Sequence, residues 1–372
     1  MYESMSKISE LYTLLQDEKS KRLFEDRLLY ELQSSVEHIL PMLFHAEIVS
    51  SEDIKLFNKQ WAELQHLFAN NPKMELVLYG SEAYGRCFAK WISNSGVRSF
   101  YFCDKKHAGE RVFGKKIIPP DALNLMSDQR YIIITAKKAY NEIKESLLEK
   151  GFSKEQILDD LALWKKSREN HPRMYFEFPD LIPIPQNGAF VDAGSYDGED
   201  AIYYSQNQNG GVLYVFEPDK ANYQKCVERF QNTGIQEVIL REDALGAKNE
   251  TLEFESHGGE RSYLSTASVN YDNVTRPGNV TKELVNVVRL DDVIEQRVSM
   301  IKMDIEGAEC DALHGAKETI MRDKPFCAIS VYHRKGDMLA IMDYLHSLVH
   351  DYRFWLRHYA VTDGDTVLYA SI

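Results

Sequence analysis

The chain has 372 residues, of which 44 are Lys or Arg and 57 are Asp or Glu, so its formal net charge is −13. Phosphate contacts need clustered basic side chains, so this charge argues against general nucleic-acid binding. Hydrophobic residues make up 44% and charged residues 27%, as in ordinary globular proteins, and no stretch reaches the ~18 apolar residues that a membrane span needs.

Residues 1–70 are predicted to be helical, because apolar residues recur there at helical spacing. The recurrence covers three runs, Ile8–Leu15, Leu23–Leu32 and Ile54–Phe68. Pro41 is expected to start or interrupt an element, because proline cannot donate a backbone hydrogen bond. The pattern is typical of a small helical bundle or a docking arm.

Residues 71–170 alternate strands and helices, which predicts a smaller Rossmann-like α/β domain with a parallel sheet. The expected strands are Met74–Tyr79, Ser99–Cys103 and Tyr131–Thr135. The turn Gly80–Gly85 follows the first strand, but Glu82 occupies the middle glycine position of the dinucleotide fingerprint. The domain resembles degenerate Rossmann-like domains that accompany sugar-modifying enzymes. We expect it to position an acceptor or a partner subunit, the alternative being a retained small-molecule site.

Residues 171–372 are predicted to form a second, longer α/β domain. The expected strands are Ala189–Ala193, Val212–Phe216, Glu237–Arg241, Met300–Asp304, Phe326–Val331, Tyr352–Arg357 and Thr366–Tyr369. The expected helices are about Glu199–Gln206, Ala221–Gln231, Cys310–Arg322 and Asp337–Leu348. The last two strands follow each other without a helix, which predicts an antiparallel pair at the sheet edge. The Gly/Ser/Asn/Thr-rich stretch 256–282 is interpreted as a substrate lid, because long loops in compact domains are usually functional or disordered.

Acidic residues follow the first three strands of this domain. The first strand runs into a turn with Asp192, Gly194 and Gly198, where glycines let the backbone approach a ligand. Glu217 ends the second strand about 20 residues on, a position that suits a ribose diol. Asp243 ends the third strand and is placed to accept from an adenine amino group. A ligand with a pyrophosphate would favour a G-x-G-x-x-G motif, which is absent here. The three acidic strand ends therefore favour an adenosine ligand that has no pyrophosphate.

The fourth strand ends in a cluster of three carboxylates, Asp304, Glu306 and Glu309. Ligands bind beyond the carboxyl ends of strands in open α/β sheets, so this is a candidate site. The carboxylates repel one another unless a cation lies near. A sulfonium, a metal ion or Lys302 could serve.

Several of these segments together resemble the FkbM family of S-adenosylmethionine-dependent methyltransferases, over about residues 175–372. The resemblance rests on FVDAGSYDGED, VFEPD, VVRLDDVI, IKMDIEGAE, YRFWLRHY and TVLYA. It implies the seven-stranded, Rossmann-like class I methyltransferase fold and O-methylation, often of sugar or polyketide hydroxyls.

The resemblance also implies roles for single residues. Asp192, Gly194 and Gly198 would hold the methionine moiety of the donor. Glu217 would bind the ribose, Asp243 would face the adenine, and Asp304 would sit beside the methyl group. The turn departs from the family at Ser195-Tyr196-Asp197, where small or apolar residues are common, and Ser195 is counted with the cofactor-binding residues.

Methyl transfer to an alcohol also needs a proton acceptor within reach. The candidates are Asp304, Glu306 and His333, which lies just past the fifth strand. Two alternatives stay open: a divalent cation held by Asp304, Glu309 or His333, or acidic residues that only favour the start of a helix near Glu309. The five cysteines are an odd number, widely spaced and without a CxxC pair, which excludes a disulfide framework and argues against a cysteine-based zinc site.

Together these features predict an S-adenosylmethionine-dependent O-methyltransferase acting on a hydroxyl of a carbohydrate or glycoconjugate. The alternatives are a methyltransferase of RNA, protein or another small molecule, and a non-catalytic tandem Rossmann binding protein.

The chain starts without the layout of a signal peptide, so a cytoplasmic location is expected. Residues 1–170 carry 25 basic and 25 acidic side chains, so the whole negative excess falls in 171–372. The neutral part is expected to dock a partner or a second copy of the chain.

Overall fold

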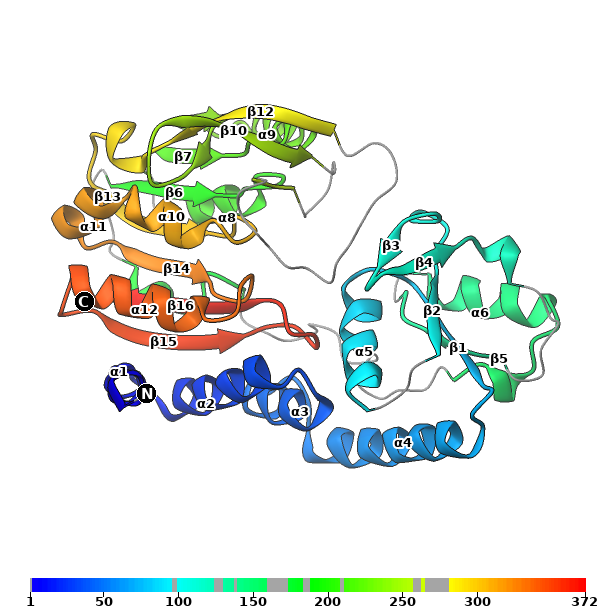
Figure 1. Cartoon of the computed structure of the whole chain (residues 1–372). Coiled ribbons are helices and arrows are strands. Elements are labelled where there is room, and N and C mark those ends of the chain that lie inside the picture. Colours follow the sequence, from blue (N-terminus) through cyan, green and yellow to red (C-terminus); the bar gives the residue numbers. More distant parts are fainter. Residues whose placement is uncertain are drawn as a thin grey trace.

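The computed structural model describes most of the chain. The described residues are 2–95, 99–123, 130–136, 139–158, 173–182, 188–207, 211–256, 262–264 and 281–372. They form two α/β bodies, and the N-terminal helices run along one edge of the larger body (Figure 1). None of the described helices is both long and apolar enough to cross a membrane.

A seven-stranded sheet forms the larger body, with the strand order β15-β16-β14-β13-β6-β7-β8. The bounds are Ala189–Ala193 (β6), Leu213–Phe216 (β7), Val238–Arg241 (β8), Val298–Met303 (β13), Phe326–Ser330 (β14), Arg353–His358 (β15) and Thr366–Ser371 (β16). All neighbours are parallel except that β16 runs antiparallel to both β14 and β15. This topology confirms the predicted seven-stranded class I fold and its antiparallel closing pair.

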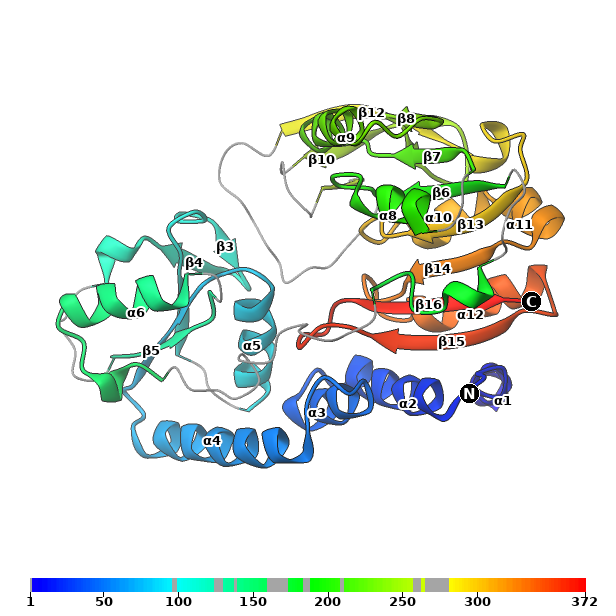
Figure 2. The same ribbon diagram turned by 180° about the vertical axis from the view of Figure 1, so that it is seen from behind.

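Helices cover both faces of this sheet (Figure 1, Figure 2). One face carries α8 (Glu199–Asn207) and α9 (Lys220–Thr233), and the other carries α10 (Glu309–His314), α11 (Lys317–Asp323) and α12 (Asp337–Leu348). Strands β6, β13 and β14 are therefore buried along their whole length, as expected for central parallel strands.

The prediction of one continuous helix over Cys310–Arg322 is wrong, because α10 and α11 separate at Gly315. The Gly315 carbonyl accepts from the Asp291 N–H at 3.0 Å instead of continuing the helix. A Cβ at this glycine would lie 2.0 Å from the Gly246 carbonyl oxygen, so only glycine fits the close approach.

A second, four-stranded sheet lies next to the large one and was not predicted. Its order is β11-β10-β12-β9, with bounds Ala244–Leu245 (β9), Glu250–Ser256 (β10), Tyr263–Leu264 (β11) and Thr281–Val288 (β12). The proposed lid 256–282 falls mostly outside the described residues. Its described part includes β11 and the start of β12, which are strands rather than loop.

The smaller body is a five-stranded sheet with the order β3-β4-β2-β1-β5. Its bounds are Glu75–Tyr79 (β1), Phe100–Cys103 (β2), Arg111–Val112 (β3), Lys115–Ile118 (β4) and Arg130–Ile134 (β5), with helices α5 (Ala83–Asn94) and α6 (Tyr140–Glu149). The three predicted strands are confirmed as β1, β2 and β5, parallel to one another. Strands β3 and β4 were missed.

Short 3-10 helices occur at Pro120–Ala122, Lys154–Gln156, Pro179–Leu181 and Leu290–Asp292.

Four helices precede the small sheet: α1 (Tyr2–Thr13), α2 (Glu18–Leu32), α3 (Val36–His45) and α4 (Ser51–Asn70). Pro41 lies inside α3 and neither starts nor ends it, because the residues on either side of it are buried in the core. Buried side chains of these helices share one hydrophobic core with the large sheet. The helices therefore pack on both bodies: α2 contacts β15 through Ser20, and α4 contacts α5 through Phe57 and Trp61.

The segment after α1 extends the large sheet at its β15 edge. Leu15 forms a parallel bridge with Phe354, whose N–H donates to the Leu14 carbonyl while its carbonyl accepts from the Gln16 N–H. The helical spacing predicted through Leu14 and Leu15 is thus wrong. These residues pair with a strand instead, because an open sheet edge offers unpaired backbone groups.

Candidate active site

The predicted site residues other than Asp243 gather where β6, β7, β13 and β14 end. The register places Asp192 of β6 beside Lys302 of β13. Just beyond, the Asp304 N–H donates to the Ala193 carbonyl at 3.0 Å. Because these strands are parallel, their carboxyl ends share one edge of the sheet. The residues predicted to bind the cofactor and those predicted to act in catalysis therefore lie next to each other there.

A buried ion pair lies at the base of this edge. The Lys302 Nζ is 2.9 Å from the Asp192 Oδ1 and donates to the Gly194 carbonyl at 2.7 Å, while the Ser195 hydroxyl donates to the Asp192 Oδ2 at 2.7 Å. Burial disfavours the ammonium, but the carboxylates of Asp192, Asp200 and Asp304 outweigh it and raise the pKa of Lys302. Lys302 thus supplies the cation that the acidic strand ends require.

Two glycines shape the turn after β6. Gly194 has a φ of +75° and Gly198 a φ of +81°, in the left-handed region that favours glycine. A Cβ on Gly194 would lie 1.9 Å from the Asp304 carbonyl oxygen, and one on Gly198 would lie 2.8 Å from the Phe230 ring. The turn therefore lies against the β13 end with no room for a side chain at Gly194.

Glu217 follows β7 and is buried against this turn. Its Oε2 accepts from the Tyr196 N–H at 2.7 Å and its Oε1 accepts from the Asp219 N–H at 2.9 Å. Burial raises the pKa of Glu217 to about 7, although the two N–H donors act in the opposite direction. A group with this pKa is held near its titration point at neutral pH.

Asp243 lies after β8 and is partly exposed. Its Oδ2 accepts from the Arg241 Nε at 2.7 Å and lies 2.6 Å from the Arg241 Nη2. The carboxylate is thus engaged by a guanidinium of its own strand. Its role toward an adenine stays a prediction.

Asp304 receives two tyrosine hydroxyls that the sequence did not predict. Tyr175 donates to its Oδ2 at 2.7 Å, and Tyr332 donates to its Oδ1 at 3.3 Å. Burial alone would raise the pKa of Asp304, but the charges of His333 and Lys302 outweigh it and hold the pKa below its usual value. Tyr332 could have been noticed as the neighbour of His333, whereas Tyr175 lies in an irregular segment with no motif around it.

His333 is buried among three carboxylates. Its Nδ1 lies 2.8 Å from the Glu309 Oε1, and its Nε2 lies 3.3 Å from the Asp304 Oδ1 and 3.9 Å from the Glu306 Oε2. Burial disfavours the imidazolium, but the carboxylates, Glu309 foremost, outweigh it and raise the pKa of His333 to about 10. The ring is therefore a cation at neutral pH.

Glu309 anchors this group from the start of α10. Its Oε1 also accepts from the Ile305 N–H at 2.9 Å, so it fixes the backbone just past β13. Its Oε2 is buried and has no hydrogen-bond partner among the described residues. Asp304, Glu309 and His333 each offer one ligand atom, and these atoms lie within 4.8 Å of one another, which suits a divalent cation.

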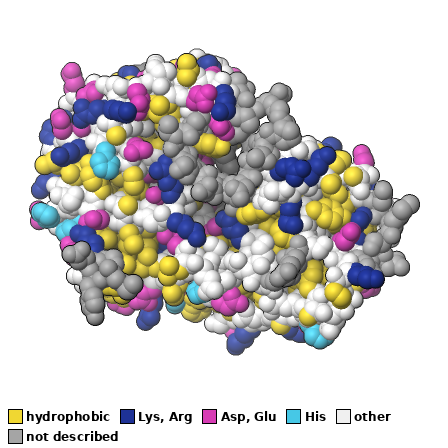
Figure 3. Space-filling model, viewed as in Figure 1, with side chains coloured by type: hydrophobic (Ala, Val, Ile, Leu, Met, Phe, Trp, Pro, Cys, Tyr) yellow, Lys and Arg dark blue, Asp and Glu magenta, His cyan; other side chains and the backbone are white. Residues whose placement is uncertain are grey.

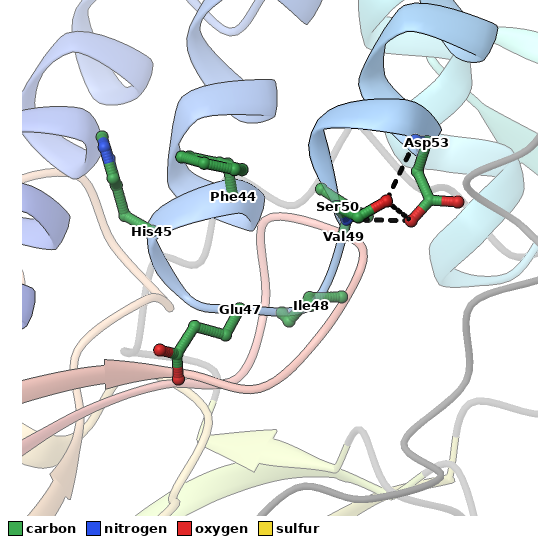
Figure 4. A pocket seen from close by; sticks show the side chains of 7 residues that line it. All are labelled: Phe44, His45, Glu47, Ile48, Val49, Ser50 and Asp53. Atoms are coloured by element: carbon green, nitrogen blue, oxygen red, sulfur yellow. Dashed lines mark hydrogen bonds between the residues drawn. The ribbon is translucent and has the colours of Figure 1, made fainter.

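An open hollow elsewhere contains none of the predicted site residues. It lies at the turn between α3 and α4 and is lined by Phe44, His45, Glu47, Ile48, Val49, Ser50 and Asp53 (Figure 4). Ser50 and Asp53 bond to each other as a capping box at the start of α4. The Glu47 carboxylate pairs with Lys19. The polar groups here serve the helix ends, so the hollow is a structural feature.

The outer surface does not concentrate charge of one sign on the face drawn in Figure 3. Basic and acidic side chains of the described residues are interspersed there, with apolar side chains between them. A surface of this kind has no large single-sign field toward a charged partner.

Comparisons with known proteins identify the class of the larger body. Residues 192–356 match the family model described as the methyltransferase FkbM domain. This segment is thus similar to an FkbM methyltransferase domain, and the protein is a methyltransferase.

Two sequence relatives bear names of the same class. The 2-O-methyltransferase NoeI of Sinorhizobium fredii (strain NBRC 101917 / NGR234) is 26% identical over 225 residues, which cover 55% of this chain and 88% of that protein. Methyltransferase 1 of Beauveria bassiana (strain ARSEF 2860) is 24% identical over 152 residues, 37% of this chain and 61% of that protein. The crystal structure of methyltransferase FkbM from Methylobacillus flagellatus KT aligns over 83% of this chain and 93% of its own, with 21% identity and a TM-score of 0.49.

Proposed function

We propose that the protein is an S-adenosylmethionine-dependent O-methyltransferase that acts on a hydroxyl of a carbohydrate or glycoconjugate. The FkbM domain over residues 192–356 carries this proposal. The name of NoeI as a 2-O-methyltransferase supports oxygen as the acceptor atom. The sugar class is supported by the resemblance of the sequence motifs to the FkbM family.

The donor would lie over the turn after β6. The glycine at position 194 lets this turn lie directly against the end of β13, and the buried pair of Asp192 and Lys302 fixes its backbone. Each Glu217 oxygen accepts one backbone N–H and has a further lone pair, so the carboxylate can also accept from ribose hydroxyls. When bound, S-adenosylmethionine supplies an electrophilic methyl carbon on a positively charged sulfur.

Asp304 is proposed as the catalytic residue that takes the hydroxyl proton. The acceptor hydroxyl would donate to its carboxylate, which Tyr175 and Tyr332 hold in place. The hydroxyl proton becomes strongly acidic as the oxygen bonds to carbon, so a carboxylate with a lowered pKa can still take it. Alignment of the two reacting atoms accounts for much of the remaining rate enhancement.

His333 is proposed to act as a cation rather than as the base. With a pKa of about 10 the imidazolium holds its proton at neutral pH, lies between Asp304 and Glu309, and helps to keep Asp304 ionised. Glu306 lies farther from the ring, at 3.9 Å, and would add negative charge at the acceptor side.

A divalent cation is the alternative to the imidazolium proton. Asp304, Glu309 and His333 would hold it, and the buried, unpartnered Oε2 of Glu309 fits such a ligand set. Bound there, the metal would polarise the acceptor hydroxyl and lower its pKa.

The test is a methyl-transfer assay with labelled S-adenosylmethionine against a panel of sugar nucleotides, oligosaccharides and cell glycans. RNA and total protein serve as competing acceptors. We expect label on a glycan as an alkali-stable methyl ether, located by mass spectrometry. Label on RNA or protein alone would overturn the carbohydrate assignment. Each assay is repeated with EDTA, and loss of activity that Mg²⁺ or Mn²⁺ restores would place a metal, not the proton, between the three side chains.

A further inference from the structure

Helix α2 lies outside residues 192–356, which match the FkbM model, yet it contacts the loop that carries His333. The loop runs from Val331 to Gly336, between β14 and α12. Tyr332 and His333 project from it toward Asp304. A contact that fixes this loop therefore fixes the acceptor side of the proposed site.

Two residues of α2 hold the two ends of this loop. The Arg27 Nη2 donates to the Tyr332 carbonyl at 3.4 Å, and the Glu31 Oε2 accepts from the Gly336 N–H at 2.9 Å. Arg27 and Glu31 are one helical turn apart and are joined by an ion pair of 3.0 Å between Nε and Oε1. Their side chains are 4% and 11% exposed, so water screens these contacts little.

The same guanidinium fixes a second loop beside the first. The Arg27 Nη1 donates to the Asp363 carbonyl at 2.6 Å, in the connection between β15 and β16. The Asp363 carboxylate accepts from Tyr30 at 3.1 Å and from Lys90 at 3.0 Å. Arg27 thus stands between two loops of the methyltransferase domain.

We propose that Arg27 and Glu31 are positioning residues, through which helix α2 holds the loop 331–336 so that Tyr332 and His333 meet Asp304. The catalytic part of the inference rests on the proposed function of Asp304 and His333. The FkbM domain alone would then lack part of its own active-site support. A buried ion pair that is hydrogen-bonded to both ends of a loop restricts the loop to one conformation. Residues that surround a catalytic group commonly orient it in this way.

The first test compares variants of α2 with one variant of its partner strand β15. Arg27→Met and Glu31→Ala are expected to lower kcat about tenfold or more. Donor affinity by calorimetry is expected to stay unchanged, because the proposed donor site is the turn after β6 and not the loop 331–336. Arg22→Met is the surface control, since Arg22 is 57% exposed and 4.0 Å from its partner Glu25. Arg357→Met is the docking control, since Arg357 ties α2 to β15 through Asp17 and Ser20 without touching the loop.

The outcomes separate positioning from general destabilisation. A loss of kcat in Arg27→Met and Glu31→Ala, but not in an Arg357→Met variant of equal or lower Tm, supports the proposal. Wild-type kcat in Arg27→Met and Glu31→Ala, or an equal loss in all buried variants, overturns it.

A second measurement needs no activity, so it holds even if the proposed function fails. Amide hydrogen exchange of peptides covering 331–337 reports the Gly336 N–H that Glu31 accepts. Exchange there is expected to accelerate in Glu31→Ala and Arg27→Met and to match the wild type in Arg357→Met. Unchanged exchange in Glu31→Ala would show that α2 does not hold the loop.

Discussion

Gly80 of the small sheet and Gly194 of the large sheet occupy matching places after the central strands β1 and β6. The Gly80 N–H donates to the Cys103 carbonyl at the end of β2, and the Gly194 N–H donates to the Phe216 carbonyl at the end of β7. In both sheets, an acidic residue after the second strand then accepts a backbone N–H from the glycine turn. Asp104 accepts from Ser81 and Glu217 accepts from Tyr196.

The two sheets differ in the residue that comes after the strand on the other side. Thr135 comes after β5 and Asp304 after β13, and the N–H of each donates to the carbonyl before the glycine. The Thr135 hydroxyl donates back to the Gly80 carbonyl at 2.8 Å, so it serves the turn itself. Asp304 instead receives Tyr175 and faces His333. The two sheets thus share a backbone arrangement at this turn and differ in the side chains at the neighbouring strand end.

The largest expected effect comes from removing the negative charge of Asp304, at the position where the small sheet has Thr135. Asp304→Asn is expected to lower kcat by ~10²–10⁴, because the amide cannot take the hydroxyl proton. Donor affinity should change little. Thr135→Val removes the matching side-chain donor in the small sheet and should leave kcat unchanged. Steady-state kinetics on the true acceptor measure both, and wild-type kcat in Asp304→Asn would exclude it as the catalytic residue.

Replacing the turn glycines Gly194 and Gly80 with alanine tests the backbone arrangement that the two sheets share. Gly194→Ala should lower the free energy of unfolding by about 2–4 kcal/mol, since its Cβ would meet the Asp304 backbone. Gly80→Ala should cost less, because its nearest backbone atom would be at 2.8 Å rather than 1.9 Å. Gly234→Ala is the matched control, with a positive φ but open space around it. Denaturant unfolding measures all three, and an equal cost in Gly194→Ala and Gly234→Ala would contradict the close packing.

The acidic partners of the two turns should differ in ligand binding. Glu217→Ala is expected to weaken S-adenosylmethionine binding by about 1–3 kcal/mol through lost charged hydrogen bonds. Asp104→Ala should leave it unchanged, because Asp104 belongs to the other sheet. Calorimetry with both variants checks this, and an unaltered affinity in Glu217→Ala would remove its ribose role.

The smallest effect is a pH dependence of donor affinity. The pKa of Glu217 lies at about 7, so its carboxylate is ionised above that pH and protonated below it. The ionised form accepts more hydrogen bonds, so affinity should fall as the pH drops, by up to about tenfold per unit below pH 7. Glu217→Gln should flatten this profile. A wild-type profile that is flat between pH 6 and 8 would contradict the proposed link.

The central strands could be predicted from the sequence because their signal is local. Buried parallel strands are short apolar runs, and the runs around Val191 and Ile301 end directly in acidic residues. The second sheet was missed because Glu250–Ser256 has only two apolar residues, too few for a clear alternation, and pairs with Thr281–Val288 across a long separation. No local pattern records such a pairing.

The candidate site was predictable only as far as its residues lie on strand ends. Asp192, Glu217 and Asp304 could be placed in this way. Tyr175 and Arg27 could not, because each reaches the site from a distant segment through tertiary packing. The ion pair of Asp243 with Arg241 likewise depends on side-chain conformation, which spacing does not determine.

The pairing of Leu15 with Phe354 has a consequence for how the chain matures. Residues 14–16 are synthesised long before their partner strand, since the neighbouring pair of Asp17 and Arg357 is separated by 340 positions. Until then the apolar faces of α2 and α3 lack their final packing surface. Contacts of such sequence separation form slowly. Newly made chains should therefore depend on chaperones during this interval more than a chain whose first segment folds on its own.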